Sequence, residues 1–210
     1  MNQRLLRLLI ESRKDFVLEK SCRDCHVWGV DSLVLDDSDK MIRMYVARSN
    51  HELWKNYYKP TSVAIHPHHC DLTLNHVYGG VFNISYIKSD KFNLASFRRS
   101  NNFKIWQYDS KLRNGKGSFE EKGYAHLYCS SYKKMNDGEK IQMNAYELHT
   151  MFVPEKELAA WIVEEGVEDK DYQPICYSNE DLQNFNSEGM YGKMDEAYLD
   201  ELLEELEKAI

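Results

Sequence analysis

The sequence predicts a single, mainly β domain of the sandwich or barrel type with a helix at each end. Three features of the chain support this fold class. Most of the stretch between residues 26 and 164 alternates apolar and polar side chains with a period of two, as half-buried strands do. Polar turns separate these runs at short intervals, which is typical of all-β domains. Both ends of the chain carry apolar residues at helical spacing.

Composition and charge limit the class of function. Of the 210 residues, 42% are hydrophobic and 12% aromatic, which is enough apolar material for one core. The 27 basic and 34 acidic residues give a net charge of −7, so no nucleic-acid partner is expected. No apolar run is long enough to span a membrane, and the first residues lack a signal-peptide cleavage site. Five cysteines, an odd number, favour reduced thiols and a cytoplasmic location.

The domain divides into three predicted parts. Residues 1–20 contain an amphipathic helix that packs on the barrel, residues 21–166 form the β-barrel, and residues 167–210 form an acidic loop and a C-terminal helix. The apolar faces of the two helices suit docking on the barrel or contact with a second subunit. A homodimer through the terminal helices is therefore the predicted assembly.

Within the barrel, residues 26–35 and 41–47 flank a polar turn and form a predicted hairpin. The other strand candidates are short and alternate in the same way. They lie at residues 62–78, 81–87, 92–98, 103–108, 124–132, 140–151 and 158–164.

A Cys-x-x-Cys-His string at Cys22, Cys25 and His26 is open to three interpretations. It has the spacing of a c-type haem attachment site, but the chain carries no sign of export. It is also half of a zinc site, but no second Cys-x-x-Cys pair exists. The third interpretation is a packed turn, which we favour.

The chemistry-bearing residues are densest between Pro60 and Leu74, where His66, His68 and His69 are close to Cys70 and Asp71. In a strand, successive side chains point to opposite faces, so His66 and His68 share one face and His69 and Asp71 the other. Either pair supplies two ligands of the kind that bind zinc, iron, manganese or nickel.

This stretch resembles the first motif of the cupin superfamily. That motif has a His-x-His pair, an acidic residue four or five positions later, and a glycine seven beyond. Here the pair is His66-x-His68, and Gly79 and Gly80 stand at the expected distance. Positions 72 and 73 carry Leu and Thr in place of the acidic residue.

A second stretch resembles the second cupin motif, which begins with a glycine and contains a third histidine. The distance from Gly138 to His149 matches that motif. Asn144, Tyr146 and Val153 replace its Pro, second Gly and Asn. The two motifs occur in the cupin order, and together they cover about a quarter of the predicted β segment.

The resemblance implies a cupin-like double-stranded β-helix with His66, His68 and His149 as ligands of a divalent metal. Iron(II) is the expected ion, with zinc, manganese or nickel as alternatives. The missing acidic ligand implies a three-histidine site similar to that of cupin-like thiol dioxygenases. Asp71 is a further ligand candidate if the strand carries a bulge.

A rival arrangement, His69-x-Asp71 with His149, resembles the metal triad of the 2-oxoglutarate-dependent oxygenases. That family carries an arginine or lysine about ten residues after the last histidine. Ala159 occupies this position, and the nearest basic residue, Lys156, lies in a predicted turn. The rival is therefore less well supported.

Other polar residues are candidates for the pocket lining. Tyr146 precedes the third histidine by three residues, Tyr128 lies on the preceding strand beside His126, and Arg98 or Arg99 can anchor a carboxylate or phosphate. We assign Tyr146, Tyr128 and Arg98 to the catalytic group.

These residues predict a metal-dependent oxidoreductase of the dioxygenase type that acts on a small polar molecule. A metal-dependent isomerase or lyase and a non-enzymatic small-ligand binder or regulator are the alternatives. The sequence carries no phosphate-binding loop, no nucleophile elbow and no His-Glu-x-x-His helix, which argues against the corresponding enzyme classes.

Overall fold

The computed structural model describes residues 3–25, 29–48, 65–89, 100–108, 118–154, 158–183 and 190–209. Its helices are α1 (Gln3–Ser12), α2 (Lys14–Lys20) and α5 (Glu196–Ala209). Its strands are β1 (Cys22–Arg23), β2 (Val30–Asp36), β3 (Ile42–Arg48), β4 (Leu72–Tyr78), β5 (Val81–Lys88), β6 (Ser100–Tyr108), β7 (Phe119–Met135), β8 (Lys140–Met143), β9 (Leu148–Phe152), β10 (Leu158–Glu165), β11 (Ile175–Ser178) and β12 (Gly192–Lys193).

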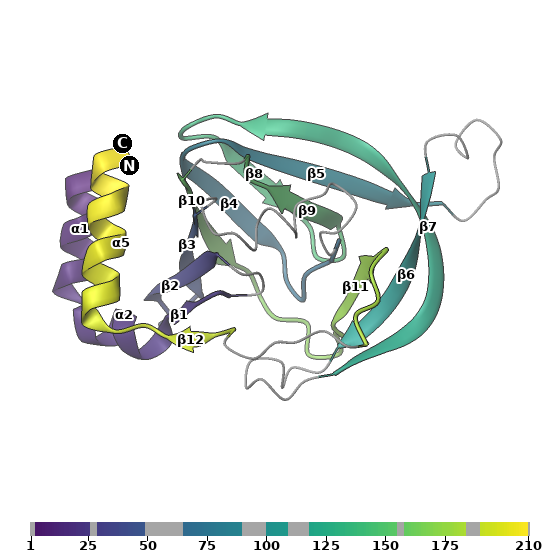
Figure 1. The fold of residues 1–210 in the computed structure, drawn as a ribbon, viewed down its shortest axis with the longest axis horizontal. Helices are drawn as coiled ribbons and strands as arrows, with labels where there is room; N and C mark the ends of the chain where they lie inside the picture. The colour runs from purple at the N-terminus through teal and green to yellow at the C-terminus, as the bar shows by residue number, and fades with distance from the viewer. Residues whose placement is uncertain are drawn as a thin grey trace.

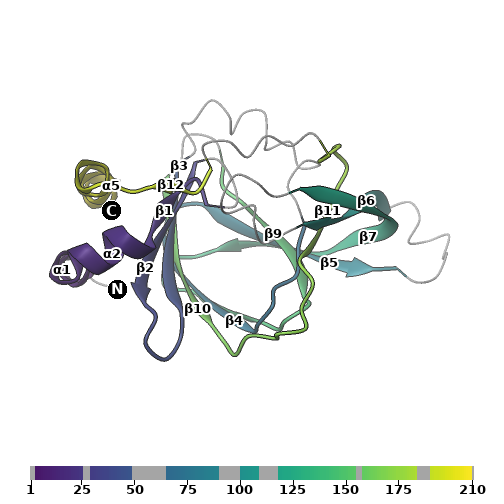
Figure 2. The same cartoon turned by 90° about the horizontal axis from the view of Figure 1, so that it is seen from below.

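The strands form two antiparallel sheets that curl around a common interior (Figures 1 and 2). The larger sheet has the order β12-β1-β2-β3-β10-β4-β8, and the smaller has the order β11-β6-β7-β5-β9. Strands that are neighbours in space are often far apart in sequence, as β10 is from β3 and β4. The architecture is mainly β and cupin-like, as predicted.

The core between the sheets is apolar. Alternate residues of the larger sheet, such as Leu74 and Trp161, share one buried cluster with Val81 and Met135 of the smaller sheet. Strand alternation places the intervening residues, such as Ile162, on the outer face. Both faces of the larger sheet are therefore buried.

The terminal helices cover this outer face, and α1 and α5 run side by side (Figure 1). Ile10 and Leu202 belong to the cluster that also contains Ile162. Ion pairs from Arg7 to Glu207 at 2.5 Å and from Lys14 to Asp200 join the helices at their rims. In the structure the terminal helices pack against the larger sheet, and a homodimer through them stays a prediction.

A buried carboxylate helps to hold α5 in place. Asp31 lies on the helix-facing side of β2, with only 1% of its surface exposed, and Tyr198 donates a hydrogen bond to it at 2.8 Å. Burial raises the pKa of Asp31, and the hydrogen bond from Tyr198 acts against that shift. The guanidinium groups of Arg23 and Arg48 lie over the Tyr198 ring. Hydrogen bonding and cation–π contacts thus supplement apolar packing at this helix.

The observed elements refine several predicted boundaries. The hairpin is confirmed as β2 and β3. The run at 140–151 divides into β8 and β9, because residues 144–147 form a turn. The β structure continues past residue 166, since β11 and β12 are edge strands of the two sheets. The candidate strand at 92–98 lies outside the described residues.

Two glycines of the cupin-like motifs adopt left-handed backbone conformations. Gly79 has φ of +88° between β4 and β5, and a Cβ there would lie 2.1 Å from the Leu158 carbonyl oxygen. Gly138 has φ of +77° before β8. Tyr146, which replaces the second glycine of the motif, also has a positive φ of +67°. These positions therefore keep the backbone conformation that glycine favours.

Across the part of the chain that the structure describes, no helix combines the length and the apolar character needed to cross a membrane.

Candidate metal centre

A short extended segment at Ile65 and His66 joins the two outer strands of the smaller sheet. Ile65 pairs with Tyr177 of β11, and His66 pairs with His149 of β9. The N–H of His66 donates to the His149 carbonyl at 3.0 Å, and the N–H of His149 donates back at 3.2 Å. Direct pairing across strands brings the side chains of His66 and His149 together.

The next residues leave the sheet, and loops from elsewhere in the chain hold them. Tyr172 donates its hydroxyl to the Pro67 carbonyl at 3.0 Å. The N–H of Tyr146 approaches the His68 carbonyl at 3.5 Å, and the N–H of Asp169 donates to the His69 carbonyl at 2.7 Å. His68 is thus placed by loop contacts, not by the regular strand that the sequence predicted.

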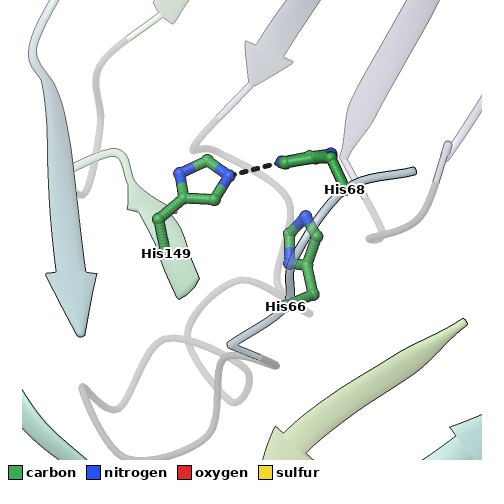
Figure 3. Close-up of side chains that lie close together, drawn as sticks. All are labelled: His66, His68 and His149. Atoms are coloured by element: carbon green, nitrogen blue, oxygen red, sulfur yellow. Dashed lines mark hydrogen bonds between the residues drawn. The ribbon is translucent and has the colours of Figure 1, made fainter. Parts of the chain in front are cut away.

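The ring nitrogens of His66, His68 and His149 converge (Figure 3). One nitrogen from each ring lies within 4.8 Å of the others, and Nε2 of His68 is 2.7 Å from Nε2 of His149. The ring centroids of the three histidines are separated by 4.8, 5.2 and 4.9 Å. The three residues predicted to share a site therefore do meet.

The most buried of the three rings, His149, is held by an amide. Its Nδ1 lies 2.8 Å from Oδ1 of Asn83, and the two residues are 3% and 5% exposed. With that oxygen as acceptor, Nδ1 carries the proton, and Nε2 presents a lone pair to the cluster. Burial, reinforced by the neighbouring His66 ring, lowers the pKa of His149 to about 3. His149 is therefore neutral at physiological pH, which is the form that binds metals.

Asp71 and His69 lie outside this cluster. The Asp71 carboxylate accepts a hydrogen bond from the backbone N–H of Ala145 at 2.6 Å. His69 is directed toward Glu165, with its Nε2 3.9 Å from that carboxylate. The described residues thus assemble the His66-x-His68 arrangement with His149, and the rival arrangement through His69 and Asp71 does not form.

His69 belongs to a second group of possible metal donors, together with Cys70 and Glu165. One donor atom from each of these residues lies within 4.8 Å of the other two. Cys70 is almost completely buried, and this burial, with the charge of Glu165, raises the pKa of its thiol to about 11.

The residues proposed for the catalytic group have different positions. Tyr146 is largely exposed, and its hydroxyl donates to Asp169. Tyr128 pairs with Ile87 of β5, and strand alternation puts both on the sheet face that carries His149. Arg98 lies outside the described residues. Tyr146 approaches the cluster through its backbone N–H, at the His68 carbonyl, whereas its hydroxyl is directed at Asp169.

The Cys-x-x-Cys segment forms a tight turn. Asp24 has φ of +50°, and its carboxylate accepts a hydrogen bond from the N–H of Gly29 at 2.7 Å. The N–H of Cys25 donates to Val30 at 2.6 Å. His26 lies outside the described residues, and neither metal-donor group found among the described residues contains Cys22 or Cys25. This geometry supports the packed turn.

Comparisons with known proteins add only fold-level similarity. No protein-family model matches the chain, and a search of curated proteins found no match. The polyketide cyclase RemF from Streptomyces resistomycificus has a TM-score of 0.40 at 10% identity, covering 79% of this chain and 84% of the cyclase. A cupin-like protein from Thermotoga maritima has a TM-score of 0.31 at 10% identity, covering 82% and 81%.

Hydroxypropylphosphonic acid epoxidase from S. wedmorenis has a TM-score of 0.38 at 7% identity. The alignment covers 70% of this chain but only 56% of the epoxidase. Because all three TM-scores are below 0.5, the candidate metal centre is inferred from the side chains of this chain alone.

Proposed function

We propose that His66, His68 and His149 bind one divalent metal ion and that the protein is a cupin-type oxidoreductase of the dioxygenase kind. The observation that carries this proposal is the neutral, oriented His149. Its Nδ1 hydrogen bond to Asn83 directs a bare Nε2 at His68, and this use of the second ring nitrogen is typical of metal-bound histidines.

The donor spacing fits a small ion after modest movement. With metal–nitrogen bonds of about 2.1 Å, neighbouring ligands are about 3.0 Å apart on an octahedral face and about 3.4 Å apart in a tetrahedron. The observed separation of 2.7 Å between His68 and His149 is shorter, because these nitrogens share a hydrogen bond. A bound ion replaces that shared proton, and a small rotation of the partly exposed His68 ring is enough to open the space.

The donor set favours iron(II), with zinc, manganese and nickel as alternatives. A metal held by three imidazoles keeps open coordination positions for oxygen and for a donor atom of the substrate. The chain itself fixes the ligands: Asn83 holds the tautomer and orientation of His149, and backbone pairing to β9 holds His66. Tyr128, on the same sheet face as His149, is a proposed contact for a small polar substrate.

Metal analysis tests this proposal. Untagged protein is purified without chelators, reconstituted with anaerobic Fe(II), and compared with His149→Ala and with the control His126→Ala. His126 is exposed on β7 and lies outside the cluster. We expect about one equivalent of metal to be lost in His149→Ala and retained in His126→Ala. Equal metal content in both variants, or none in the wild type, contradicts a site at these histidines.

Oxygen consumption then separates the enzyme from a binding protein. Metal-loaded protein is screened with small thiols, hydroxy acids and other polar molecules in an oxygen electrode. Substrate-dependent oxygen uptake that His149→Ala abolishes supports the dioxygenase. Metal-dependent turnover without oxygen uptake indicates an isomerase or lyase, and ligand binding without turnover indicates a regulator.

We also propose that the protein works in a reducing compartment, the cytoplasm, since Cys70 and Cys176 are buried thiols.

A further inference from the structure

The second donor group, formed by His69, Cys70 and Glu165, combines imidazole, thiol and carboxylate, the three ligand types that zinc prefers. We propose that these residues form a second metal site, separate from the three-histidine cluster and selective for zinc or another ion that binds thiolate. His68 and His69 are adjacent in sequence but serve different groups, because His68 is directed at His149 and His69 at Glu165.

The backbone holds the three donors together before any ion binds. Glu165 ends β10 directly opposite Leu72 in the antiparallel register, two residues after Cys70. The N–H of Gly166 donates to the Asp71 carbonyl at 2.8 Å. A Cβ at Gly166 would lie 2.9 Å from that carbonyl oxygen, so the close approach depends on glycine. The end of β10 and the segment carrying His69 and Cys70 are therefore fastened to each other.

The two oxygens of Glu165 have different roles. Oε1 accepts a hydrogen bond from Nε of Arg43 at 2.9 Å, and this ion pair is mostly shielded from solvent. Oε2 lies 3.9 Å from Nε2 of His69. Arg43 thus orients the carboxylate and leaves the second oxygen directed at the other donors. Ligands of a tetrahedral zinc ion are about 3.4 Å apart, so a contraction of about half an ångström brings His69 and Glu165 to ligand spacing. No pair of donor atoms in the group is more than 4.8 Å apart, so none has to close by more than about 1.4 Å.

Access and charge suit a cation. A surface cleft of about 350 Å³ reaches Glu165 of the group, and its charged lining residues are the three carboxylates Asp71, Glu164 and Glu165 and the one lysine Lys40. Cys70 also lies within electrostatic range of Glu168. Negative charge around the cleft favours entry of a divalent ion. Binding converts the Cys70 thiol to a thiolate, and its proton is released to solvent.

Cobalt substitution tests this site independently of the first one. Metal-free full-length protein is titrated with Co(II), and a thiolate-to-cobalt charge-transfer band in the near ultraviolet is recorded. The three-histidine cluster contains no sulfur, so only a cysteine ligand produces this band. We expect the band in the wild type and in His149→Ala, and its loss in Cys70→Ser. The control Cys176→Ser, also at a buried thiol, keeps the band.

A second variant covers the case in which Cys70→Ser does not fold. Because the His69 side chain is partly exposed, we expect His69→Ala to fold and to weaken Co(II) binding at the thiolate site by about 10–100-fold. Absence of the charge-transfer band in the wild type overturns the inference. The inference is also overturned if Cys22→Ser loses the band and Cys70→Ser keeps it. Unchanged Co(II) affinity in His69→Ala also overturns it. None of these results affects metal binding that depends on His149, so the two proposals fail separately.

Discussion

Removal of the Asn83 side chain gives the sharpest test of how the three-histidine cluster is organised. In Asn83→Ala the Nδ1 proton of His149 loses the Asn83 oxygen as its acceptor inside a buried site. An unsatisfied buried donor costs about 1–3 kcal/mol of unfolding free energy. Free choice between the two neutral tautomers accounts for a smaller part of the loss of metal affinity, because some of the molecules still keep Nε2 bare. Most of the loss of metal affinity should come from the lost orientation of the His149 ring. We therefore expect metal affinity in Asn83→Ala to fall about 10–100-fold.

Two measurements on the same variants check this reasoning. Urea unfolding of metal-free protein gives the stability change, and anaerobic competition with a chelator gives the Fe(II) affinity. Asn83→Asp keeps an acceptor for Nδ1 and should retain the metal. Asn75→Ala is the matched control, since the Asn75 side chain donates to Glu164 on the larger sheet and not to one of the three histidines. An Fe(II) affinity in Asn83→Ala equal to that of the wild type would refute the orienting role.

Three other perturbations have defined outcomes. In metal-free protein the unfolded chain takes up a proton at His149 below about pH 6.5, whereas the folded chain does so only near pH 3. As the pH is lowered between these values, the unfolding free energy therefore falls by about 1.4 kcal/mol per pH unit. His149→Gln removes this titration, so its unfolding free energy should depend less on pH. Equal slopes in the variant and the wild type would count against a buried neutral ring. Gly79→Ala forces a Cβ to 2.1 Å from a carbonyl oxygen and should prevent stable folding, whereas Gly138→Ala has open space and should lose only about 1–2 kcal/mol in urea unfolding; similar losses would contradict the steric argument. Leu202→Ala, at a fully buried position on α5, should cost about 2–5 kcal/mol by thermal or urea unfolding, and exposed Leu8→Ala should cost less than about 0.5; equal effects would contradict docking of α5.

The spacing of residues along the sequence was enough to predict part of the candidate site. His66 and His68 were found because two histidines two positions apart point the same way in an extended segment, and His149 because its distance from Gly138 matched a family motif. Asn83 was not found, because its role depends on the pairing of β5 with β9, which no local pattern encodes. The available signal was an amide side chain within a mainly apolar strand.

The same limit explains why some predicted boundaries of strands and loops were wrong. Alternation predicted one strand over residues 62–78. In the described part of that run, residues 65–66 and 72–78 pair with other strands, whereas residues 67–71 follow contacts from distant loops. The acidic composition after residue 166 suggested a loop, yet β11 forms an edge of the smaller sheet. Its pairing with β6 is determined by Cys176 and Tyr177, which are buried apolar residues inside a short polar stretch.

The segment from Ile65 to Asp71 connects the two proposed metal sites with the edge strands of the smaller sheet. Ile65 and His66 link the two edge strands of the smaller sheet, and His68 to Cys70 supply donors to both candidate metal groups. Because a metal bound only by the folded state stabilises it by RT ln(1 + [L]/Kd), an ion at one hundred times its Kd adds about 2.7 kcal/mol. That energy acts on a segment with little regular secondary structure of its own. The loops that carry Tyr146 and Asp169 hydrogen-bond to the same segment, so fixing it with metal also fixes the loops beside the histidines. The proposed metal binding would therefore be coupled to the ordering of the loops around the site.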